Sequence, residues 1–272
     1  MKCSVMHVLL FIILPTAAQG QPLSPISPVF QSGEELRYKV KWNFFRLGTI
    51  TIRTLHASMC TELEDYKIHM IVESNPDLSF IWIREFNESI MDARSLFSRG
   101  FRGDHRNGND LCQIQQSYDR ERRIATSVIR DLNSGAVLRA DTLRDVDPYV
   151  EGPSLFITTR CISRFGKSLS VPTMVGGKIA ATDLNFSFPL EEVEIDAVDM
   201  PVRVHKYEGF AHWKGGSEAG LSGEFTGWIT DDDAAVPVRA EMKVILGSIR
   251  LELESWNRPG WVPPTGLRAS NQ

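Results

Sequence analysis

The run Asp231-Asp232-Asp233 is the densest group of residues in the chain that could do chemistry. Adjacent carboxylates can bind a calcium ion, and a single carboxylate can act as a general acid or base in hydrolysis. The calcium loop of an EF-hand, however, spaces its acids at alternate positions around a glycine, and this run does not. Aspartate is also common in turns, because its side chain accepts hydrogen bonds from the nearby backbone. The run therefore predicts a solvated turn between strands, and a catalytic role for Asp232 is the alternative.

Arg160 is a cation within an apolar stretch, 155–165, whose spacing is helical. If this helix faces a sheet, the guanidinium needs a carboxylate partner, because an unpaired buried charge is strongly destabilising. We expect Asp231 or Asp232 to supply that carboxylate. The pair would join the helix to the sheet or, alternatively, form a polar spot inside a ligand-binding cleft.

Six tryptophans are many for one chain, and indole rings serve both as stacking surfaces for sugars and as walls for lipid chains. Trp42, Trp82 and Trp228 fall within alternating segments and are expected in the core. Trp213 and Trp261 stand among glycines or prolines and are expected to be more exposed. The candidate ligand-binding residues of the chain are the following five: Arg160, Trp213, Trp228, Asp231 and Asp232.

The sequence lacks the usual motifs for metal, cofactor or covalent chemistry. Its histidines form no HExxH motif and no close pair of ligands. It contains no Gly-x-Ser-x-Gly elbow, P-loop or dinucleotide-binding fingerprint. We therefore expect no catalytic constellation, no metal site and no cofactor. The polar, glycine-rich segment 99–110 is expected to be a mobile loop, with a binding lid as the alternative.

The first twenty residues have the pattern of a signal peptide. Lys2 provides a positive charge, Val8 to Leu14 form an apolar core, and Ala18-Gln19-Gly20 offers small residues for cleavage. A short membrane anchor and a buried N-terminal helix are the alternatives. No later segment of the sequence is long and apolar enough for a transmembrane helix. We expect an exported protein, periplasmic or secreted, without a transmembrane segment once residues 1–20 are removed.

The net charge limits the classes of partner that the protein can bind, and the cysteines bear on possible disulfide bonds. The net charge of −4 at pH 7 argues against a nucleic-acid partner, and against simple electrostatic docking on anionic lipid. Beyond the signal peptide the cysteines are Cys60, Cys112 and Cys161. In an oxidising compartment Cys60 and Cys112 are the one pair that we would test for a disulfide. Cys161 is expected to be a small buried hydrophobe within the helix.

Alternation of apolar and polar residues predicts that strands dominate the chain. The segment 34–42 alternates strictly, and 78–90 is expected to be a strand with apolar residues on both faces. Near the other end, 223–256 is typical of three consecutive strands. The last two would be joined by a two-residue type II′ turn at Gly247-Ser248.

One segment departs from this pattern and predicts a helix from Tyr149 or Ser154 to Phe165, with Gly166 as its stop. About twelve strands and this helix predict a mainly β fold, a large curved antiparallel sheet or half-open barrel around one central helix. Its two halves would lie at 30–145 and 167–256. We expect a single domain over 33–256, preceded by a linker, 21–32, and followed by a flexible tail, 257–272.

Several of these segments together carry a family resemblance. They are Gly33-Glu-Glu-Leu-Arg-Tyr-Lys-Val-Lys-Trp42 with Leu47-Gly48, Asp147 with Ser154-Leu-Phe-Ile-Thr-Thr-Arg160, and Gly227-Trp-Ile-Thr-Asp-Asp-Asp-Ala-Ala-Val-Pro237 with Gly247-Ser248. Their order and spacing resemble those of the bacterial DUF3108 family, over most of residues 30–256. The resemblance implies an exported, β-dominated protein of the cell envelope with no established activity.

The absence of catalytic motifs and the excess of aromatic residues favour a non-enzymatic function. We expect the protein to bind an apolar or amphiphilic ligand, lipid-like or a glycan, or to dock another envelope protein. A hydrolase that acts on envelope glycan or peptide through a carboxylate such as Asp232 is one alternative. A structural module that recruits other envelope proteins is another.

Overall fold

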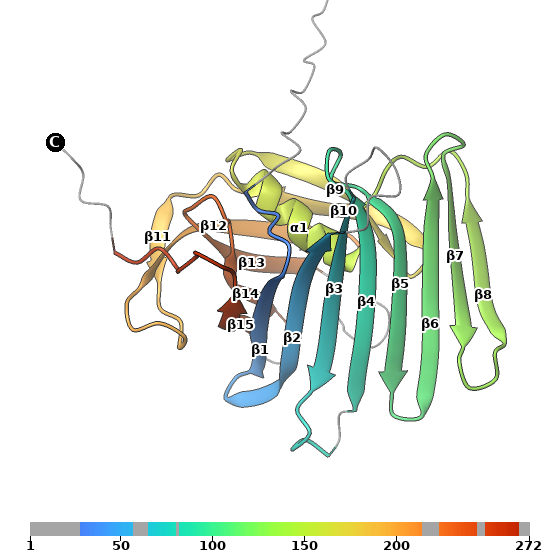
Figure 1. Ribbon diagram of the computed structural model, residues 1–272, viewed down its shortest axis with the longest axis horizontal. Coiled ribbons are helices and arrows are strands. Elements are labelled where there is room, and N and C mark those ends of the chain that lie inside the picture. Colours follow the sequence, from blue (N-terminus) through green and yellow to red (C-terminus); the bar gives the residue numbers. More distant parts are fainter. Residues whose placement is uncertain (1–27, 57–64, 80–81, 214–222, 244–247, 267–272) are drawn as a thin grey trace, which may run out of the picture.

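The computed structural model of the protein describes residues 28–56, 65–79, 82–213, 223–243 and 248–266 (Figure 1). Strands dominate these residues, and they contain one helix. The prediction of a mainly β fold built around one helix is therefore confirmed. The signal-peptide prediction falls on residues 1–20, which lie outside the described part of the chain.

The first half of the chain is an antiparallel meander in which each strand pairs with the next. Its strands are β1 (Glu34–Trp42), β2 (Phe45–His56), β3 (Asp65–Ser74), β4 (Ile83–Asp92), β5 (Ser98–Asn107), β6 (Asp110–Asp119), β7 (Ile124–Asp131) and β8 (Val137–Leu143).

The second half is also antiparallel, with one departure from sequential pairing, because β12 pairs with both β10 and β11. Its strands are β9 (Ser168–Val175), β10 (Lys178–Asn185), β11 (Leu190–Val193), β12 (Val202–Ala211), β13 (Gly223–Thr230), β14 (Pro237–Lys243) and β15 (Ser248–Asn257). The three strands expected over 223–256 are thus β13, β14 and β15.

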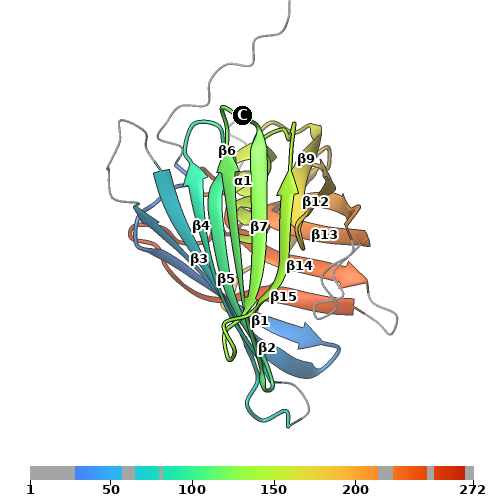
Figure 2. The ribbon, with the colours of Figure 1, turned by 90° about the vertical axis from the view of Figure 1, so that its right-hand side faces the viewer.

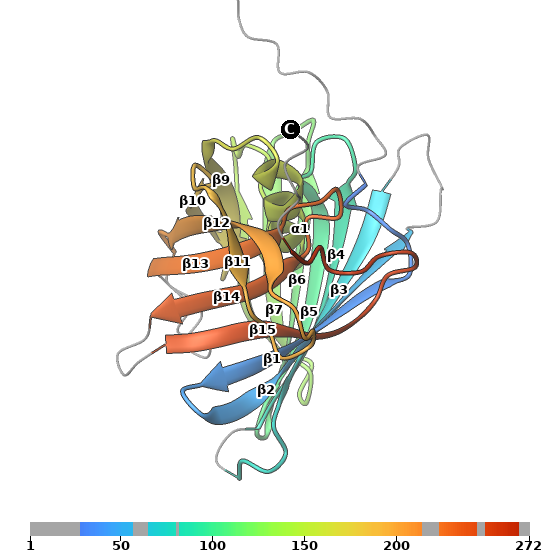
Figure 3. The same ribbon diagram turned by 90° about the vertical axis from the view of Figure 1, so that its left-hand side faces the viewer.

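The two halves form one sheet of 15 strands, because β1 pairs with β15. β8 and β9 lie at the two ends of the strand order, so the sheet is not closed into a barrel. Figures 2 and 3 show that β4–β7 run steeply across the direction of β13–β15. The expected curved, half-open barrel is the observed architecture.

The helix α1 (Gly152–Ser163) connects the two open ends, since it follows β8 and precedes β9. It begins after Glu151, which forms a capping box with Ser154, and Pro153 suits the first turn because its missing N–H would have no partner there. Gly166, with a φ of +58°, follows its end. In the described part of the chain, no helix has the length and apolar character needed to cross a bilayer.

The chain that leads into α1 covers part of an open edge. Val150 forms a parallel bridge with Thr173 of β9, and its backbone bonds to Pro172 and Met174. An uncovered edge strand presents unpaired N–H and C=O groups to other chains. The bridge therefore pairs some of these groups within the molecule.

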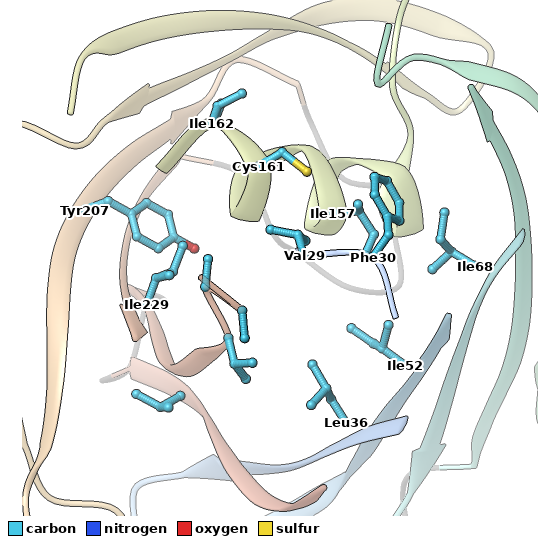
Figure 4. Close-up of a cluster of buried hydrophobic side chains, with 14 of the residues drawn as sticks. Val29, Phe30, Leu36, Ile52, Ile68, Ile157, Cys161, Ile162, Tyr207 and Ile229 are labelled. Atoms are coloured by element: carbon cyan, nitrogen blue, oxygen red, sulfur yellow. The ribbon is translucent and has the colours of Figure 1, made fainter. Parts of the chain in front are cut away.

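The core lies between α1 and the concave face of the sheet (Figure 4). Ile157 lies on the side of α1 that faces Leu36 and Ile52 of the first half, and Ile229 of the second half belongs to the same buried cluster. Because one helix serves both halves, burial of its apolar side chains links them in one large hydrophobic cluster, beside which Ala125, Val146, Tyr149 and Met174 form a smaller one.

The seam between β1 and β15 is also joined by ion pairs. Arg37 lies 3.4 Å from Glu254, and Lys39 lies 2.8 Å from Glu252, which is buried. Arg46, on β2, makes a two-pronged contact with Glu254 at 2.6 and 2.8 Å. These pairs connect residues that are more than 200 positions apart in the sequence.

The segment expected to be a mobile loop, 99–110, is instead part of the sheet. It contributes most of β5, which pairs with β4 on one side and with β6 on the other. Glycine suits position 103 because the side chains of Asn87 and His105 occupy the space where a Cβ would project. Gly103 therefore reflects close packing within the sheet, and Gly108, with a φ of +59°, lies at the turn between β5 and β6.

The predicted two-residue turn at Gly247-Ser248 is wrong. Ser248 belongs to β15 and pairs with Lys243 of β14, so it is a strand residue and not half of a two-residue turn with Gly247. Residues 244–247 lie outside the described part of the chain.

The described ends of the chain pack on the domain. Val29 and Phe30, within the expected linker, belong to the core, and Phe30 stacks on Tyr66 with ring centroids 4.1 Å apart. Within the expected flexible tail, Arg258 is buried and Thr265 forms a bridge with Val202. The expectation of a frayed tail therefore does not hold for 258–266. Hydrogen-bonding partners for Arg258 inside the domain hold this segment in place.

Candidate functional site

A cavity of about 240 Å³ lies between α1 and the concave face of the sheet. Its walls come from both halves of the sheet and from the helix, and most of its lining is hydrophobic. Side chains that define it include Ile50, Met70, Leu155, Phe156, Phe225 and Leu251. Because such side chains make no hydrogen bonds, the cavity suits an apolar group.

Two glycines shape one wall of this cavity. Gly227 of β13 pairs with Tyr207 of β12, and the Tyr207 ring covers it so closely that a Cβ would overlap the ring. The same relation holds two pairs away, where the Phe225 ring covers Gly209. The two rings meet edge to face with centroids 6.2 Å apart. Large rings over glycines thus form a smooth aromatic surface.

Two hydroxyl groups that reach this cavity, those of Tyr38 and Thr159, have partners within the protein. The Tyr38 hydroxyl donates to the carbonyl of Pro237 at 2.9 Å, and Thr159 Oγ1 donates to the carbonyl of Leu155 at 2.8 Å. Burial raises the pKa of Tyr38 well above its ordinary value, against the opposing effect of Arg160, so the phenol is neutral. These satisfied groups leave little hydrogen bonding for a ligand.

The volume sets the size of the group that fits. An engineered cavity of about 150 Å³ holds benzene, and sites for drug-sized ligands begin at about 300 Å³. At about 240 Å³ the cavity falls between these sizes. It accommodates one slender apolar chain or ring, and not a whole phospholipid.

Trp213 and Trp228, both candidates from the sequence, lie in different places. Trp213 lines the cavity, and its Nε1 donates to Thr182 Oγ1 at 2.8 Å. Trp228 is three residues from Phe225 in β13, so its side chain lies on the opposite face of the strand from the cavity. There its indole N–H donates to Glu191.

Two other tryptophans differ from expectation. Trp82, expected in the core, is 64% exposed, because β4 begins one residue later, at Ile83. Trp261, expected to be exposed, packs against the core, and its Nε1 donates to Asp232 Oδ2 at 2.7 Å.

Arg160 is fully buried (0% exposed), but its carboxylate partner is Glu34 and not Asp231 or Asp232. Arg160 Nη1 lies 2.5 Å from Glu34 Oε1, and the other guanidinium nitrogens donate to the carbonyls of Ala234 and Ala235 at 2.9 and 3.1 Å. Arg258 donates to the second Glu34 oxygen. The prediction of an aspartate partner is wrong because the aspartates follow Thr230 outside the core, whereas Glu34 opens β1 beneath α1.

Asp231 and Asp232 line a second, larger hollow of about 940 Å³ beyond the C-terminal end of α1. Asp231 Oδ1 and His205 Nε2 are hydrogen-bonded at 3.0 Å. The other Asp231 oxygen, Oδ2, lies 3.5 Å from Arg203 Nε. The structure therefore does not bring the five candidate ligand-binding residues together in one place.

Both carboxylate oxygens of Asp232 are occupied. Oδ1 accepts from Thr230 Oγ1 at 2.8 Å and from the Ala235 N–H at 3.0 Å, and Oδ2 accepts from Trp261. This pattern is that of an aspartate that closes a turn. The structure places the Asp231–Asp233 run between β13 and β14, as a turn, which agrees with the leading sequence interpretation.

Among the described residues, no group of three or more His, Cys, Asp or Glu side chains is arranged to hold a metal ion. The Cys60–Cys112 pair cannot be placed, because Cys60 lies outside the described residues. Cys161 is buried in α1.

The sequence interpretation missed Glu34 and the cavity lining. A signal for Glu34 exists, because it shares the face of the first strand that carries Leu36 and Tyr38, and an acid on an apolar face needs a buried partner. The cavity lining carries no such signal. It is drawn from strands distant in sequence, and ordinary core residues have the same composition.

The comparisons with known proteins agree with this architecture. The family model described as "Protein of unknown function (DUF3108)" matches residues 37–254, so the chain belongs to that family. The resemblance proposed from the sequence is therefore confirmed. No curated protein matches the chain.

A solved structure shares the fold. It is the crystal structure of a beta-barrel-like protein of domain of unknown function DUF1849 from Brucella abortus. The two chains superpose with a TM-score of 0.52 at 10% sequence identity, covering 84% of this chain and 98% of the other. At this identity the likeness is one of fold.

Proposed function

We propose that the protein is a non-enzymatic binding protein that holds the apolar chain of a lipid-like ligand in the cavity beneath α1. The observation that carries this proposal is the cavity itself, about 240 Å³ of space bounded mainly by hydrophobic side chains. Native interiors are packed closely, with few voids larger than a water molecule. A partly open space of this size between a helix and a sheet, lined mainly by apolar side chains, is therefore suited to an apolar group.

The compartment is part of the same proposal. The N-terminal pattern of Lys2, the apolar run Val8–Leu14 and the small residues at 18–20 supports export to the periplasm or the cell exterior. In that setting, lipid-like molecules of the envelope are the available amphiphiles. A glycan fits less well, because sugar hydroxyls need hydrogen-bonding partners that this cavity does not offer.

The test compares what the purified protein carries with what a cavity-filled variant carries. Ala240 lines the cavity, so Ala240→Phe places a ring in the space proposed for the ligand. Ala136→Phe adds the same ring at an exposed turn between β7 and β8 and serves as the matched control. Organic extracts of the three proteins are analysed by mass spectrometry.

We expect an amphiphile with a single slender chain in extracts of the wild type and of Ala136→Phe, and its loss from Ala240→Phe. Binding of added decanoic acid, followed by calorimetry, should show the same order. Empty extracts together with no decanoic acid binding by the wild type would overturn the proposal. Equal binding by Ala240→Phe would place the ligand elsewhere.

A further inference from the structure

A row of apolar residues leads from the cavity to the margin of the sheet. Phe225 and Met242 line the cavity and pair across β13 and β14. Met242 pairs with Ile249 of β15, and Ile249 pairs with Trp42 of β1. Trp42 in turn pairs with Phe45 of β2. Directly paired residues of antiparallel strands share one face, so this row of five lies on the cavity side of the sheet.

Within the described part of the chain, the row is only partly covered. Its first four members are half-buried, and Phe45 is 60% exposed. The rings of Trp42 and Phe45 stack with centroids 6.4 Å apart. Beyond them, Phe44 is 99% exposed at the turn between β1 and β2. We call Trp42, Phe44 and Phe45 the aromatic tip.

The aromatic tip stands apart from the rest of the molecule. Figure 1 shows the β1–β2 connection at the lower end of the first half, away from α1. Asn43, beside Phe44, has a φ of +51°, a conformation that asparagine tolerates better than most residues, so a tight turn projects the rings. Isolated exposed hydrophobic residues are common, but adjacent exposed phenylalanines that continue an apolar row are not.

The chemistry of the tip favours a lipid bilayer as its partner. Tryptophan and phenylalanine insert readily at the boundary between headgroups and acyl chains. The neighbouring cations do not offer free charge, because Lys41 lies 3.1 Å from Asp196 and Arg46 is paired with Glu254. With a net charge of −4, the protein would dock through its rings and not through attraction to anionic lipid.

We propose that the aromatic tip docks on a bilayer surface and that the apolar row guides a lipid chain between that bilayer and the cavity. Only the guiding of a lipid chain to the cavity rests on the proposed function. Docking by the tip needs no ligand in the cavity. The docking proposal and the proposed function can therefore be tested, and can fail, separately.

The docking test is flotation of the full chain with phosphatidylcholine vesicles. The double variant Phe44→Ser/Phe45→Ser removes both exposed rings, and we expect its vesicle partitioning to fall about tenfold or more. Phe165→Ser, which removes a 48% exposed ring just after α1, is the matched control and should bind as the wild type does. Any binding through the apolar segment 8–14 is common to all three proteins and does not affect the differences.

Salt and lipid charge sharpen this test. Docking through rings predicts similar binding at low and high salt and to vesicles with or without phosphatidylglycerol. Equal flotation of the double variant and the wild type would overturn the proposal. A second result would also overturn it: neither protein floats, and cross-linking in cells captures a neighbouring protein with the wild type but not with the double variant. The aromatic tip would then be a docking surface for a protein.

Decanoic acid binding separates the two proposals. We expect the double variant to bind decanoic acid from solution as the wild type does, since the cavity is intact. Ala240→Phe should lose decanoic acid but still float. If the wild type binds no decanoic acid yet floats through its tip, docking stands and the proposed function fails. If the tip variant loses both properties while Phe165→Ser retains them, a separate docking role for the tip is wrong.

Discussion

Glu34 is the point at which four parts of the chain meet. Its carboxylate receives Arg160 from α1 and Arg258 from the C-terminal segment, and it is itself 1% exposed at the start of β1. The two guanidinium groups also donate to backbone carbonyls of 28–29 and 234–235. Removing the one acid would leave two buried cations without a carboxylate.

We therefore expect Glu34→Gln to lower the free energy of unfolding by about 3–5 kcal/mol. The neighbouring Glu35→Gln is the control, because the side chains of Glu35 and its partner Arg53 are 37% and 46% exposed, and it should cost under about 1 kcal/mol. Urea denaturation of both variants measures the difference. Similar stabilities for the two would show that the buried cluster does not hold the fold.

Glu151 presents a different case, a buried carboxyl with no cation among its hydrogen-bonding partners. Burial raises its pKa, and hydrogen bonds from Ser89 and Ser154 oppose that effect only in part. The unfolded chain titrates this group at about 4.3. The folded protein thus binds the proton more tightly than the unfolded chain does. The resulting stabilisation is complete below about pH 4.3 and is lost as pH rises through the raised pKa.

Glu151→Gln should remove this dependence, because glutamine keeps the acceptor for the two serines and stays neutral at every pH. We expect the variant to gain stability relative to the wild type as pH rises from 4 to 8. Denaturation curves at a series of pH values give the difference directly. A difference that stays constant across the range would mean that Glu151 is not held with a raised pKa.

At the scale of the elements, the cavity wall depends on glycines placed opposite aromatic rings. A Cβ at position 227 would overlap the Tyr207 ring, which is buried and lines the cavity. Gly227→Ala should therefore lower the unfolding free energy by about 1–3 kcal/mol and weaken decanoic acid binding as the ring moves.

Gly100→Ala is the matched control for this change. A Cβ there would sit 3.5 Å from the Gln116 carbonyl oxygen, an ordinary contact, and the stability should be unchanged or slightly raised. Calorimetric unfolding and decanoic acid titration of both variants provide the measurements. Equal behaviour of the two would contradict the role assigned to the Tyr207–Gly227 pair.

Local patterns were sufficient to predict most of these elements. Alternation located β1 and the three strands from β13 to β15, and three- and four-residue spacing with Gly166 located α1. The prediction failed where polar residues and glycines occur inside a strand, as in β5. There the pairing with strands on both sides, which the segment itself does not encode, decides the conformation.

At the scale of the whole molecule, the decisive contacts join distant parts of the sequence. The pairing of β1 with β15 unites the two halves, and Glu34 with Arg258 ties the ends. The periodicity of apolar residues along the sequence does not predict contacts between distant segments. For the same reason Arg160 could be expected to need an acid, but which acid could not be predicted. Of the five candidate residues, Trp213 alone lines the apolar cavity.

The central claim is that the space beneath α1 receives an apolar chain. Met70 lines only that cavity among the hollows described, whereas Met200 is 57% exposed on the surface. Methyl NMR of the methionine-labelled protein, titrated with decanoic acid, tests the claim most directly. The account predicts a saturable shift of the Met70 methyl signal with Met200 unchanged. A Met70 signal that does not move at saturating decanoic acid would contradict it.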